Sequence, residues 1–395
     1  MILGDESSGQ WDVPLEVTNI PLAMLVVFGC AKLLAEVFEK LKQPAIVGEI
    51  LAGVLIGPSV MGWIHPNPVL SALADLGVLF LLFRVGLDVK TSELLRVGPT
   101  ASLVAMLGVI APFFLGWAIM ALFHMPHMES IFVSAAMVAT SVGITAQVLA
   151  SKGVLHQRAS QIILAAAVVD DILGLIVLAV VSSLARERLH VLDIALTSLL
   201  AIGFTIAIAK WGSRTFGRMI PHVASKLKAG EVQFNLSLIL LFALSLLAMY
   251  AGVAAIVGAF LAGMALAGSV RARVRDLTHG VTELLVPFFL AGIGLQLDLS
   301  VFQNRSTLLL AGAILFAAIV SKLIGCGLGA IRLKRSEALR IGIGMIPRGE
   351  VGMVVAQLGL SMGVIQKPIY AVVVFMAVAT TLIAPPLLNL TFRDE

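Results

Sequence analysis

The sequence predicts an all-α polytopic membrane protein with about 13 transmembrane helices. Of its 395 residues, 59% are hydrophobic and only 13% are charged, which is more apolar surface than a soluble globule of this size can bury. Apolar runs recur from Pro21 to Phe392, and each is close to the roughly 20 residues that a helix needs to cross a bilayer. The runs are continuous rather than alternating, which argues against a transmembrane β-barrel.

The apolar runs set the predicted spans in order along the chain. Their limits are 17–37, 44–62, 68–88, 98–123, 128–150, 159–185, 190–210, 230–250, 253–270, 280–297, 306–331, 337–362 and 367–392.

The basic residues outside the spans predict the orientation, because loops rich in Lys and Arg stay in the cytoplasm. With the N-terminus outside, the outer loops hold only Arg186, Arg188, Arg305 and Lys367, and the other loop cations fall in the cytoplasm. We therefore expect a cytoplasmic C-terminus, and the net charge of +4 reflects membrane topology rather than nucleic-acid binding. An even number of spans, with one run misassigned, stays open.

Three segments of the first half recur in the second half. "AIVGEILAG" (45–53) returns as "AIVGAFLAG" (255–263), "FLLFRVGL" (80–87) as "FFLAGIGL" (288–295), and "VGITAQVLASKGVL" (142–155) as "VGMVVAQLGLSMGVI" (351–365). The matching spans are seven apart, and an odd difference turns the second copy upside down in the membrane. The sequence thus predicts an inverted-topology repeat, an architecture of many secondary transporters.

Two of the repeated spans are interrupted at their centres. Thr140, Ser141 and Gly143 lie in the middle of the fifth span, and Pro347 and Gly349 lie in the middle of the twelfth. Proline removes a helix donor and glycine loosens the backbone. Inverted repeats place their substrate site at such breaks, near the midplane, although a simple kink in each helix stays open.

Two carboxylates, Asp170 and Asp171, lie near the middle of the sixth span, where an ionised group is costly. Lys322, in the eleventh span, is the natural cation to pair with one of them. A carboxylate in such a place can hold either a proton or a small hard cation, and competition for it is enough to build an exchanger. A buried ion-pair network that only fixes helix packing is the structural alternative.

Four basic residues lie inside spans. Lys32 and Arg84 lie toward cytoplasmic helix ends and are expected to snorkel, whereas Lys322 and Arg348 lie deeper and need partners. Arg348 and Glu350 flank the break of the twelfth span. They are candidates to neutralise the broken-helix ends or to gate the cytoplasmic entrance, and a purely structural role is equally open.

These motifs resemble the bacterial sodium/proton antiporters of the monovalent cation:proton antiporter superfamily, close to the NapA type. The double aspartate together with the later lysine is the most specific element, since potassium/proton relatives typically lack the Asp-Asp pair. Arg84 departs from the family's usual apolar residue. The segments that carry the resemblance are "AIVGEILAGVLIGPS" (45–59), "LGVLFLLFRVGLD" (76–88), "VATSVGITAQVL" (138–149), "ILAAAVVDDILGLIVLA" (163–179), "SKLIG" (321–325) and "PRGEVG" (347–352).

The resemblance implies a homodimer in which an interface domain and a mobile core are each assembled from both repeats. The implied parts are residues 1–97 (tail and interface helices one to three), 98–188 (core helices four to six), 189–229 (linker helix seven and a basic cytoplasmic loop), 230–305 (interface helices eight to ten) and 306–395 (core helices eleven to thirteen).

The resemblance also implies the roles of the site residues. Asp171 is expected to bind the ion, Na⁺ included, while Asp170 pairs with Lys322 in a salt bridge. Thr140 and Ser141 would lie at the crossing of the two discontinuous helices and could help to coordinate the ion. The Asp-Asp pair with a lysine implies electrogenic exchange, and the core is expected to move like an elevator.

We therefore expect a transporter of a bacterial inner membrane, not an enzyme, that exchanges Na⁺, and also Li⁺, for H⁺ without a cofactor. A potassium/proton antiporter of the same fold is the first alternative. A passive cation channel and an organic-anion symporter are more distant ones, and the absence of a basic cluster at midplane argues against an anionic substrate.

Overall fold

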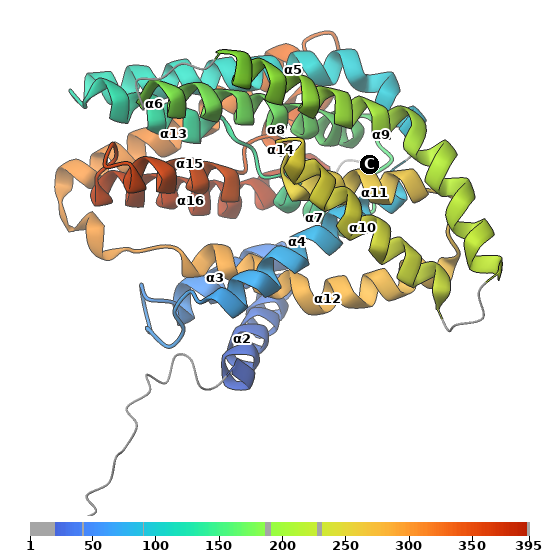
Figure 1. Cartoon of the computed structure of the whole chain (residues 1–395). Coiled ribbons are helices and arrows are strands. Elements are labelled where there is room, and N and C mark those ends of the chain that lie inside the picture. The colour runs from blue at the N-terminus through green and yellow to red at the C-terminus, as the bar shows by residue number, and fades with distance from the viewer. Residues whose placement is uncertain (1–19, 42, 90, 186–190, 227–230, 393–395) are drawn as a thin grey trace, which may run out of the picture.

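The computed structural model describes residues 20–41, 43–89, 91–185, 191–226 and 231–392, and it confirms the predicted fold class. Within these ranges the chain forms helices and contains no strand. Figure 1 shows the arrangement of the helices. They are α2 (Ile20–Lys40), α3 (Ala45–Ile56), α4 (Pro68–Asp88), α5 (Thr91–Leu122), α6 (His127–Val138), α7 (Val142–Ser151), α8 (Arg158–Ala185), α9 (Val191–Lys226), α10 (Val232–Tyr250), α11 (Ala255–Leu266), α12 (Ala272–Leu295), the 3₁₀ turn η1 (Ser300–Gln303), α13 (Arg305–Gly329), α14 (Arg335–Gly344), α15 (Glu350–Ser361) and α16 (Lys367–Thr391).

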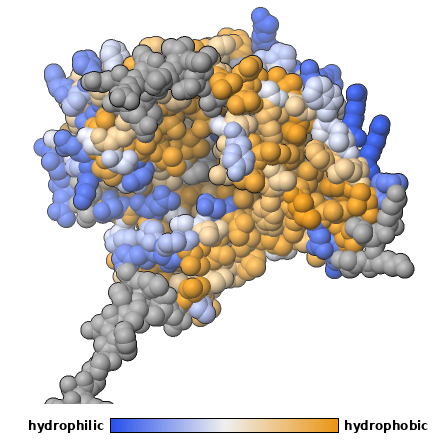
Figure 2. Space-filling model, viewed as in Figure 1, coloured by the Kyte–Doolittle hydropathy of each residue, from blue (hydrophilic) through white to orange (hydrophobic). Residues whose placement is uncertain are grey.

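The described helices can be compared with the predicted thirteen crossings. Among the described residues, nine helical segments are long and apolar enough to cross a membrane, with α6 and α7 taken as one. The prediction of thirteen needs four more crossings, and the segments at the predicted places are the short apolar helices α3 and α11, the broken pair α14 and α15, and the long helix α9. Figure 2 shows hydrophobic residues across the middle of one face, with hydrophilic residues toward its left and right ends.

Several helix limits differ from the prediction, including the starts of α5 at Thr91 and of α12 at Ala272, and two further differences have a clear physical reason. Helix α3 ends at Ile56, not near residue 62, because Gly57 is extended and Pro58 follows it, and a residue before proline avoids the helical region. Helix α9 continues to Lys226, well past the predicted limit of 210, as one amphipathic helix. The predicted first span begins within residues 1–19, which lie outside the described residues, as do Arg186 and Arg188.

The inverted repeat is visible in the closest helix contacts. Gly48 of α3 packs against the backbone of Leu34 on α2, and Gly258 of α11 packs against the backbone of Leu244 on α10. Both members of the second contact lie 210 residues after those of the first. At each contact a side chain larger than hydrogen would overlap the partner's backbone, so glycine fixes both crossings in the same way.

The two repeats also cross each other through paired glycines. A Cβ on Gly53 of α3 would overlap the carbonyl of Ala291 on α12, and one on Gly294 would overlap the carbonyl of Ile50. Gly263 of α11 and Gly86 of α4 form the corresponding contact. The repeat relation exchanges these two crossings, as expected for two halves related by a pseudo-twofold axis.

The helices pack into two sets. The interface set comprises α2, α3, α4, α10, α11 and α12, and the core set comprises α5, α6, α7, α8, α13, α14, α15 and α16. Most of the extensive packing lies within a set, such as α4 on α11 and α12, or α5 on α8 and α13. Helix α9 packs mainly on α11 and also reaches α8 and α5, so it links the two sets along the edge of the molecule (Figure 1).

Candidate functional site

Two discontinuous helices meet in the core set. Helix α6 ends at Val138 and α7 begins at Val142, while α14 ends at Gly344 and α15 begins at Glu350. The unwound segments, 139–141 and 345–349, contact each other directly: the backbone N–H of Ser141 donates to the carbonyl of Pro347 at 2.8 Å. The hydroxyl of Thr145 donates to the carbonyl of Gly344 at 2.7 Å. The breaks therefore lie where the sequence predicts them.

Glycine is required at this crossing. A Cβ on Gly349 would lie 2.6 Å from the Ser141 hydroxyl oxygen, so a larger residue would push the two unwound segments apart. Pro347 has no N–H to continue a helix. These two residues explain why the second break forms beside the first.

Arg348 occupies the break of the second helix and is fully buried. Its Nη1 donates to the carbonyls of Val138 and Ala139 at 3.1 and 3.3 Å, and its Nη2 donates to the carbonyl of Ala318 on α13 at 3.1 Å. The first two carbonyls are at the C-terminal end of α6, where the helix dipole is negative. Arg348 thus lies where a cation can neutralise a broken-helix end. The side chain of Glu350 lies outside the described residues.

Asp170 and Lys322 form an ion pair inside the protein. Lys322 Nζ lies 3.0 Å from Asp170 Oδ1, and both side chains are fully buried. Asp170 comes from α8 and Lys322 from α13, so the pair joins two helices that both pack on α5. Gly108 of α5 leaves the space for the lysine, because a Cβ there would lie 3.3 Å from Nζ and 2.7 Å from the sulfur of Cys326.

Asp171 follows directly on α8 and is 4% exposed. Successive helix residues point about 100° apart, so Asp171 faces a different direction from the Asp170–Lys322 pair. The hydroxyl oxygens of Thr140 and Ser141 are buried and form no hydrogen bond within the described part of the chain. Buried polar atoms are normally satisfied. These two hydroxyls therefore have unused hydrogen-bonding capacity; the resemblance implies that they help to coordinate the ion, and this role stays a prediction.

Two cavities open between the helix sets. The first, of about 560 Å³, is named the Asp75 cavity; it is lined by Asp75, Val78 and Phe289 of the interface set and by Met353 and Tyr370 of the core set. The second, of about 470 Å³, is named the Glu49 cavity; it is lined by Lys32, Glu49 and Glu283 of the interface set and by Gln147, Lys152 and Asn389 of the core set. The Asp75 cavity reaches toward the crossing, because Val78 and Phe289 pack on Gly143 of α7.

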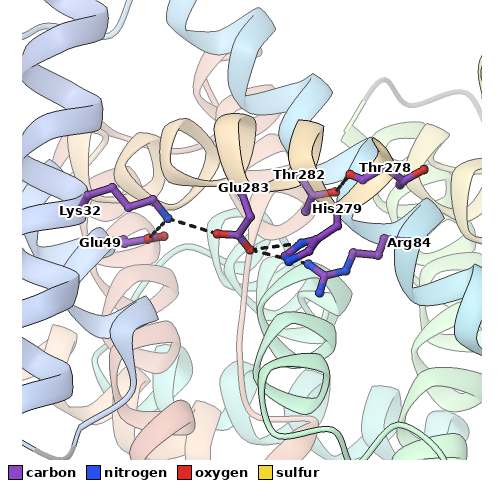
Figure 3. Close-up of polar contacts among 7 residues, drawn as sticks. All are labelled: Lys32, Glu49, Arg84, Thr278, His279, Thr282 and Glu283. Carbon is purple, nitrogen blue, oxygen red and sulfur yellow. Dashed lines mark hydrogen bonds and ion pairs between the residues drawn. The ribbon is translucent and has the colours of Figure 1, made fainter. Parts of the chain in front are cut away.

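A network of charged side chains lies beside the Glu49 cavity (Figure 3). Lys32 Nζ lies 3.1 Å from Oε1 of Glu49, whose residue is 5% exposed, and 3.6 Å from Oε2 of Glu283. The other oxygen of Glu283 lies 3.7 Å from Arg84 Nη1 and 3.6 Å from His279 Nδ1. The network joins α2, α3, α4 and α12 through Glu283.

Sequence reasoning did not identify this network. Lys32 and Arg84 were expected to snorkel, and neither was connected with Glu283. The one local signal is the spacing of His279 and Glu283, which are four residues apart on α12 and therefore neighbours on a helix face. Glu49 gives no such signal, because its partner comes from another helix.

The second half of the repeat has no counterparts of the Lys32–Glu49 pair or of the two aspartates. At the spacing of 210 residues, Phe242 and Ala259 stand where Lys32 and Glu49 stand in the first half. At the same spacing, Thr380 and Thr381 of α16 correspond to the two aspartates of α8, and the Thr380 hydroxyl accepts from the backbone N–H of Arg348 at 3.1 Å. The helix packing alone therefore does not require either set of charges.

Comparison with known proteins gives relatives over nearly the whole chain. The family profile "Sodium/hydrogen exchanger, transmembrane" matches residues 24–393. The high-affinity Na⁺/H⁺ antiporter NhaS3 of Synechocystis is 34% identical, covering 96% of this chain and 91% of the relative. The Na⁺/H⁺-K⁺ antiporter GerN of Bacillus cereus is 32% identical, covering 91% of this chain and 93% of the relative. A Na⁺/H⁺ antiporter of Enterococcus hirae is also 32% identical, with 88% and 91% covered.

A solved structure has the same fold. The electron-microscopy structure of the sodium proton antiporter MjNhaP1 from Methanocaldococcus jannaschii superposes with a TM-score of 0.74 at 18% sequence identity, covering 96% of this chain and 99% of that one.

Proposed function

Since the chain belongs to the sodium/hydrogen exchanger family and is a sodium/proton antiporter, we propose that Asp171 is the carboxylate at which Na⁺ and H⁺ compete. The observation that carries the proposal is a nearly buried aspartate beside a fully buried ion pair, in the helix set that contains both broken helices. Thr140 and Ser141 supply buried oxygens at the crossing, which suits a small hard cation.

The ion pair beside Asp171 gives the site its charge. With Asp170 and Lys322 both ionised, a proton on Asp171 leaves these three side chains neutral. When Na⁺ binds both carboxylates, Lys322 loses its counter-ion, and a buried lysine without one favours its neutral form. The sodium-loaded site then carries one negative charge. Two protons are thus exchanged for one sodium ion, and the cycle is electrogenic.

Alternating access follows from the two helix sets. The ion-binding residues lie in the core set, and the two cavities lie along its boundary with the interface set. The core set moves past the interface set as one body and carries Asp171 from one cavity to the other. The interface set forms the homodimer contact and stays fixed in the membrane while the core set moves, as in an elevator-type mechanism.

The membrane orientation follows from the loop charges. The N-terminus lies outside and the C-terminus in the cytoplasm of a bacterial inner membrane, because the outer loops are poor in Lys and Arg. In this orientation the Glu49 cavity faces the cytoplasm and the Asp75 cavity faces outward.

Potassium is a second candidate substrate. It is favoured by one relative at 32% identity, GerN, whose name includes both Na⁺ and K⁺. The choice of ion depends on the geometry of the oxygen ligands around Asp171. Oxygen ligands of this kind can bind Na⁺, Li⁺ and K⁺.

The experiment is ion exchange in proteoliposomes that contain a pH-sensitive dye. After a pH gradient is imposed, NaCl, LiCl or KCl is added in turn, with the membrane voltage either free or clamped. We expect Na⁺ to collapse the gradient at lower concentration than K⁺, at a rate that changes under the clamp. Collapse by K⁺ alone would replace sodium by potassium as the substrate, and a rate unaffected by the clamp would exclude the electrogenic cycle. No collapse with any of these cations would contradict exchange.

A further inference from the structure

A stripe of basic side chains follows one face of α9. Lys210, Arg214 and Arg218 are four residues apart, and all three are exposed. Residues at this spacing lie nearly above one another on a helix. Trp211, 61% exposed, adjoins the stripe. We name the face formed by these four residues the α9 basic stripe.

The stripe points away from the protein. On the opposite face of α9, Ala209, Gly212 and Ile220 are buried. Gly212 packs against Ala265, since a Cβ there would lie 3.1 Å from the Ala265 Cβ. Figure 1 shows α9 along the edge of the molecule, and Figure 2 shows hydrophilic side chains at that edge. The stripe therefore faces the lipid or solvent that surrounds the protein.

No acidic side chain neutralises the stripe within the described part of the chain. None of its three cations forms an ion pair there, whereas Arg273 and Arg275 of α12 contact Glu231 and Asp88. Asp193 is the sole acidic residue of α9, and it lies more than four turns before Lys210. The charge of the stripe is thus free to attract an anion from outside.

The stripe lies where a membrane surface would be. Helix α9 has 36 residues, which gives a length of about 54 Å, against about 30 Å for the hydrocarbon core of a bilayer. A crossing that begins at Val191 leaves the hydrocarbon after roughly 20 residues, near Lys210. Tryptophan is enriched at this depth, and Trp211 follows directly.

We propose that the α9 basic stripe binds the phosphate headgroups of anionic phospholipids in the cytoplasmic leaflet. An anionic phospholipid fits the stripe in charge and in position. The three cations have no acidic partner among the described residues, and they lie with the exposed indole ring at the level of the lipid headgroups. Each basic residue near such a surface favours an anionic over a neutral lipid by roughly fivefold. Because α9 packs on α11 of the interface set and also reaches α8 and α5 of the core set, bound lipid would anchor the helix that links them.

The test uses the full chain in detergent, mixed with equal amounts of phosphatidylglycerol and phosphatidylcholine, with bound lipid counted by native mass spectrometry. The variant carries Lys210→Gln, Arg214→Gln and Arg218→Gln. A matched control carries Arg332→Gln, Lys334→Gln and Arg335→Gln, the same charge change at exposed residues of another turn. A second control, Lys210→Arg with Arg214→Lys and Arg218→Lys, keeps the charge.

We expect the native chain to retain phosphatidylglycerol preferentially, and the stripe variant to lose that preference by at least about tenfold. Both controls should keep it, and raising the salt concentration should weaken it. No preference in the native chain, an unchanged preference in the stripe variant, or an equal loss in the Arg332 control would each overturn the proposal. Displacement of the lipid by millimolar inorganic phosphate would also overturn it, because the stripe would then be a site for free phosphate.

If the triple variant does not give a monodisperse protein, Arg214→Gln alone serves. It should lower the preference by roughly fivefold, and an unchanged preference would overturn the proposal. Lipid binding is measured without ion transport, so its failure is separate from any failure of the exchange mechanism.

Discussion

The two buried cations near the crossing, Lys322 and Arg348, have different short-range partners. Lys322 lies 3.0 Å from Asp170, whereas Arg348 donates to three backbone carbonyls. A charge removed from water is tolerated only when it is paired and hydrogen-bonded. The two cations therefore have different roles: Lys322 balances the charge of a carboxylate, and Arg348 stabilises the end of a helix.

Replacing Lys322 with alanine tests the first of these roles. Asp170 would remain buried without its counter-ion, which destabilises a protein by about 3–5 kcal/mol. We expect a clear fall in the melting temperature in detergent and, in proteoliposomes, exchange that no longer responds to a voltage clamp. Lys334→Ala, at an exposed position, should change neither property. An unchanged melting temperature together with unchanged voltage dependence would show that the ion pair is not needed.

Gly108 gives a second prediction, because it makes room for the lysine. Gly108→Ala places a Cβ 2.7 Å from the Cys326 sulfur and 3.3 Å from Lys322 Nζ, so the ion pair must shift. We expect slower exchange, partly restored when Cys326→Ala removes the nearer clash. The matched control is Gly98→Ala on the same helix, where nothing lies within 4 Å of the added carbon. Equal exchange rates in the Gly108 and Gly98 variants would refute this account of Gly108.

Residues differ in how readily their importance can be predicted from the sequence. Asp170, Asp171 and Lys322 stand out because an ionisable residue inside an apolar run is costly and is seldom retained without a function. Glu49 does not, because it lies near the end of a span and its partner comes from another helix. Gly108 does not either, since many glycines of such helices contact nothing.

At the scale of elements, the repeat is a set of close backbone contacts. Gly53 and Gly294 join α3 to α12, and Gly263 and Gly86 join α11 to α4. Small residues allow membrane helices to approach closely, where packing rather than hydrophobicity holds them together. The two crossings should therefore be equally sensitive to added volume.

Gly53→Ala and Gly263→Ala test this equivalence. Each adds a carbon that would overlap a backbone carbonyl, and overpacking of this kind costs about 1–3 kcal/mol or more. We expect both to lower the melting temperature by similar amounts. Gly29→Ala and Gly312→Ala, which meet nothing within 4 Å, should leave it unchanged or raise it slightly. A harmless Gly53→Ala beside a harmful Gly263→Ala would show that the two crossings are not equivalent.

The sequence predicts these elements well where its pattern has one physical meaning. Continuous apolar runs fix the helices, and mid-span Thr-Ser and Pro-Arg-Gly interruptions fix the breaks. The length of α9 is not predicted correctly, because an amphipathic helix at the membrane surface has no apolar run to define its end. The end of α3 is missed for another reason: apolar residues continue beyond Gly57 and Pro58, which terminate the helix. The carbonyl partners of Arg348 could not be predicted, since they depend on how two breaks meet.

For the whole molecule, we propose that exchange uses the two cavities that open between the helix sets. Gln147 and Tyr370 both belong to the core set, yet they line different cavities. In the proposed movement of the core set past the interface set, one cavity opens as the other closes.

Cysteine labelling tests this movement. Gln147→Cys and Tyr370→Cys are each treated with a water-soluble thiol reagent, in sodium at high pH and without sodium at low pH, with the native chain as the blank. We expect the change of conditions to alter the two labelling rates in opposite directions. Rates that change together, or that do not change, would contradict alternating access by this movement.

The role of Asp171 is tested most directly by measuring sodium-driven proton exchange in proteoliposomes for Asp171→Asn, beside the native chain and Asp276→Asn. Asparagine keeps the shape of the side chain, but its amide neither takes up a proton nor balances the charge of a bound cation. Asp276 is exposed on α12 and gives a matched control. We predict that Asp171→Asn folds and is inserted normally but exchanges no ions, while Asp276→Asn exchanges at the native rate. Sodium-dependent exchange by Asp171→Asn at the native rate would show that Asp171 is not the ion-binding carboxylate.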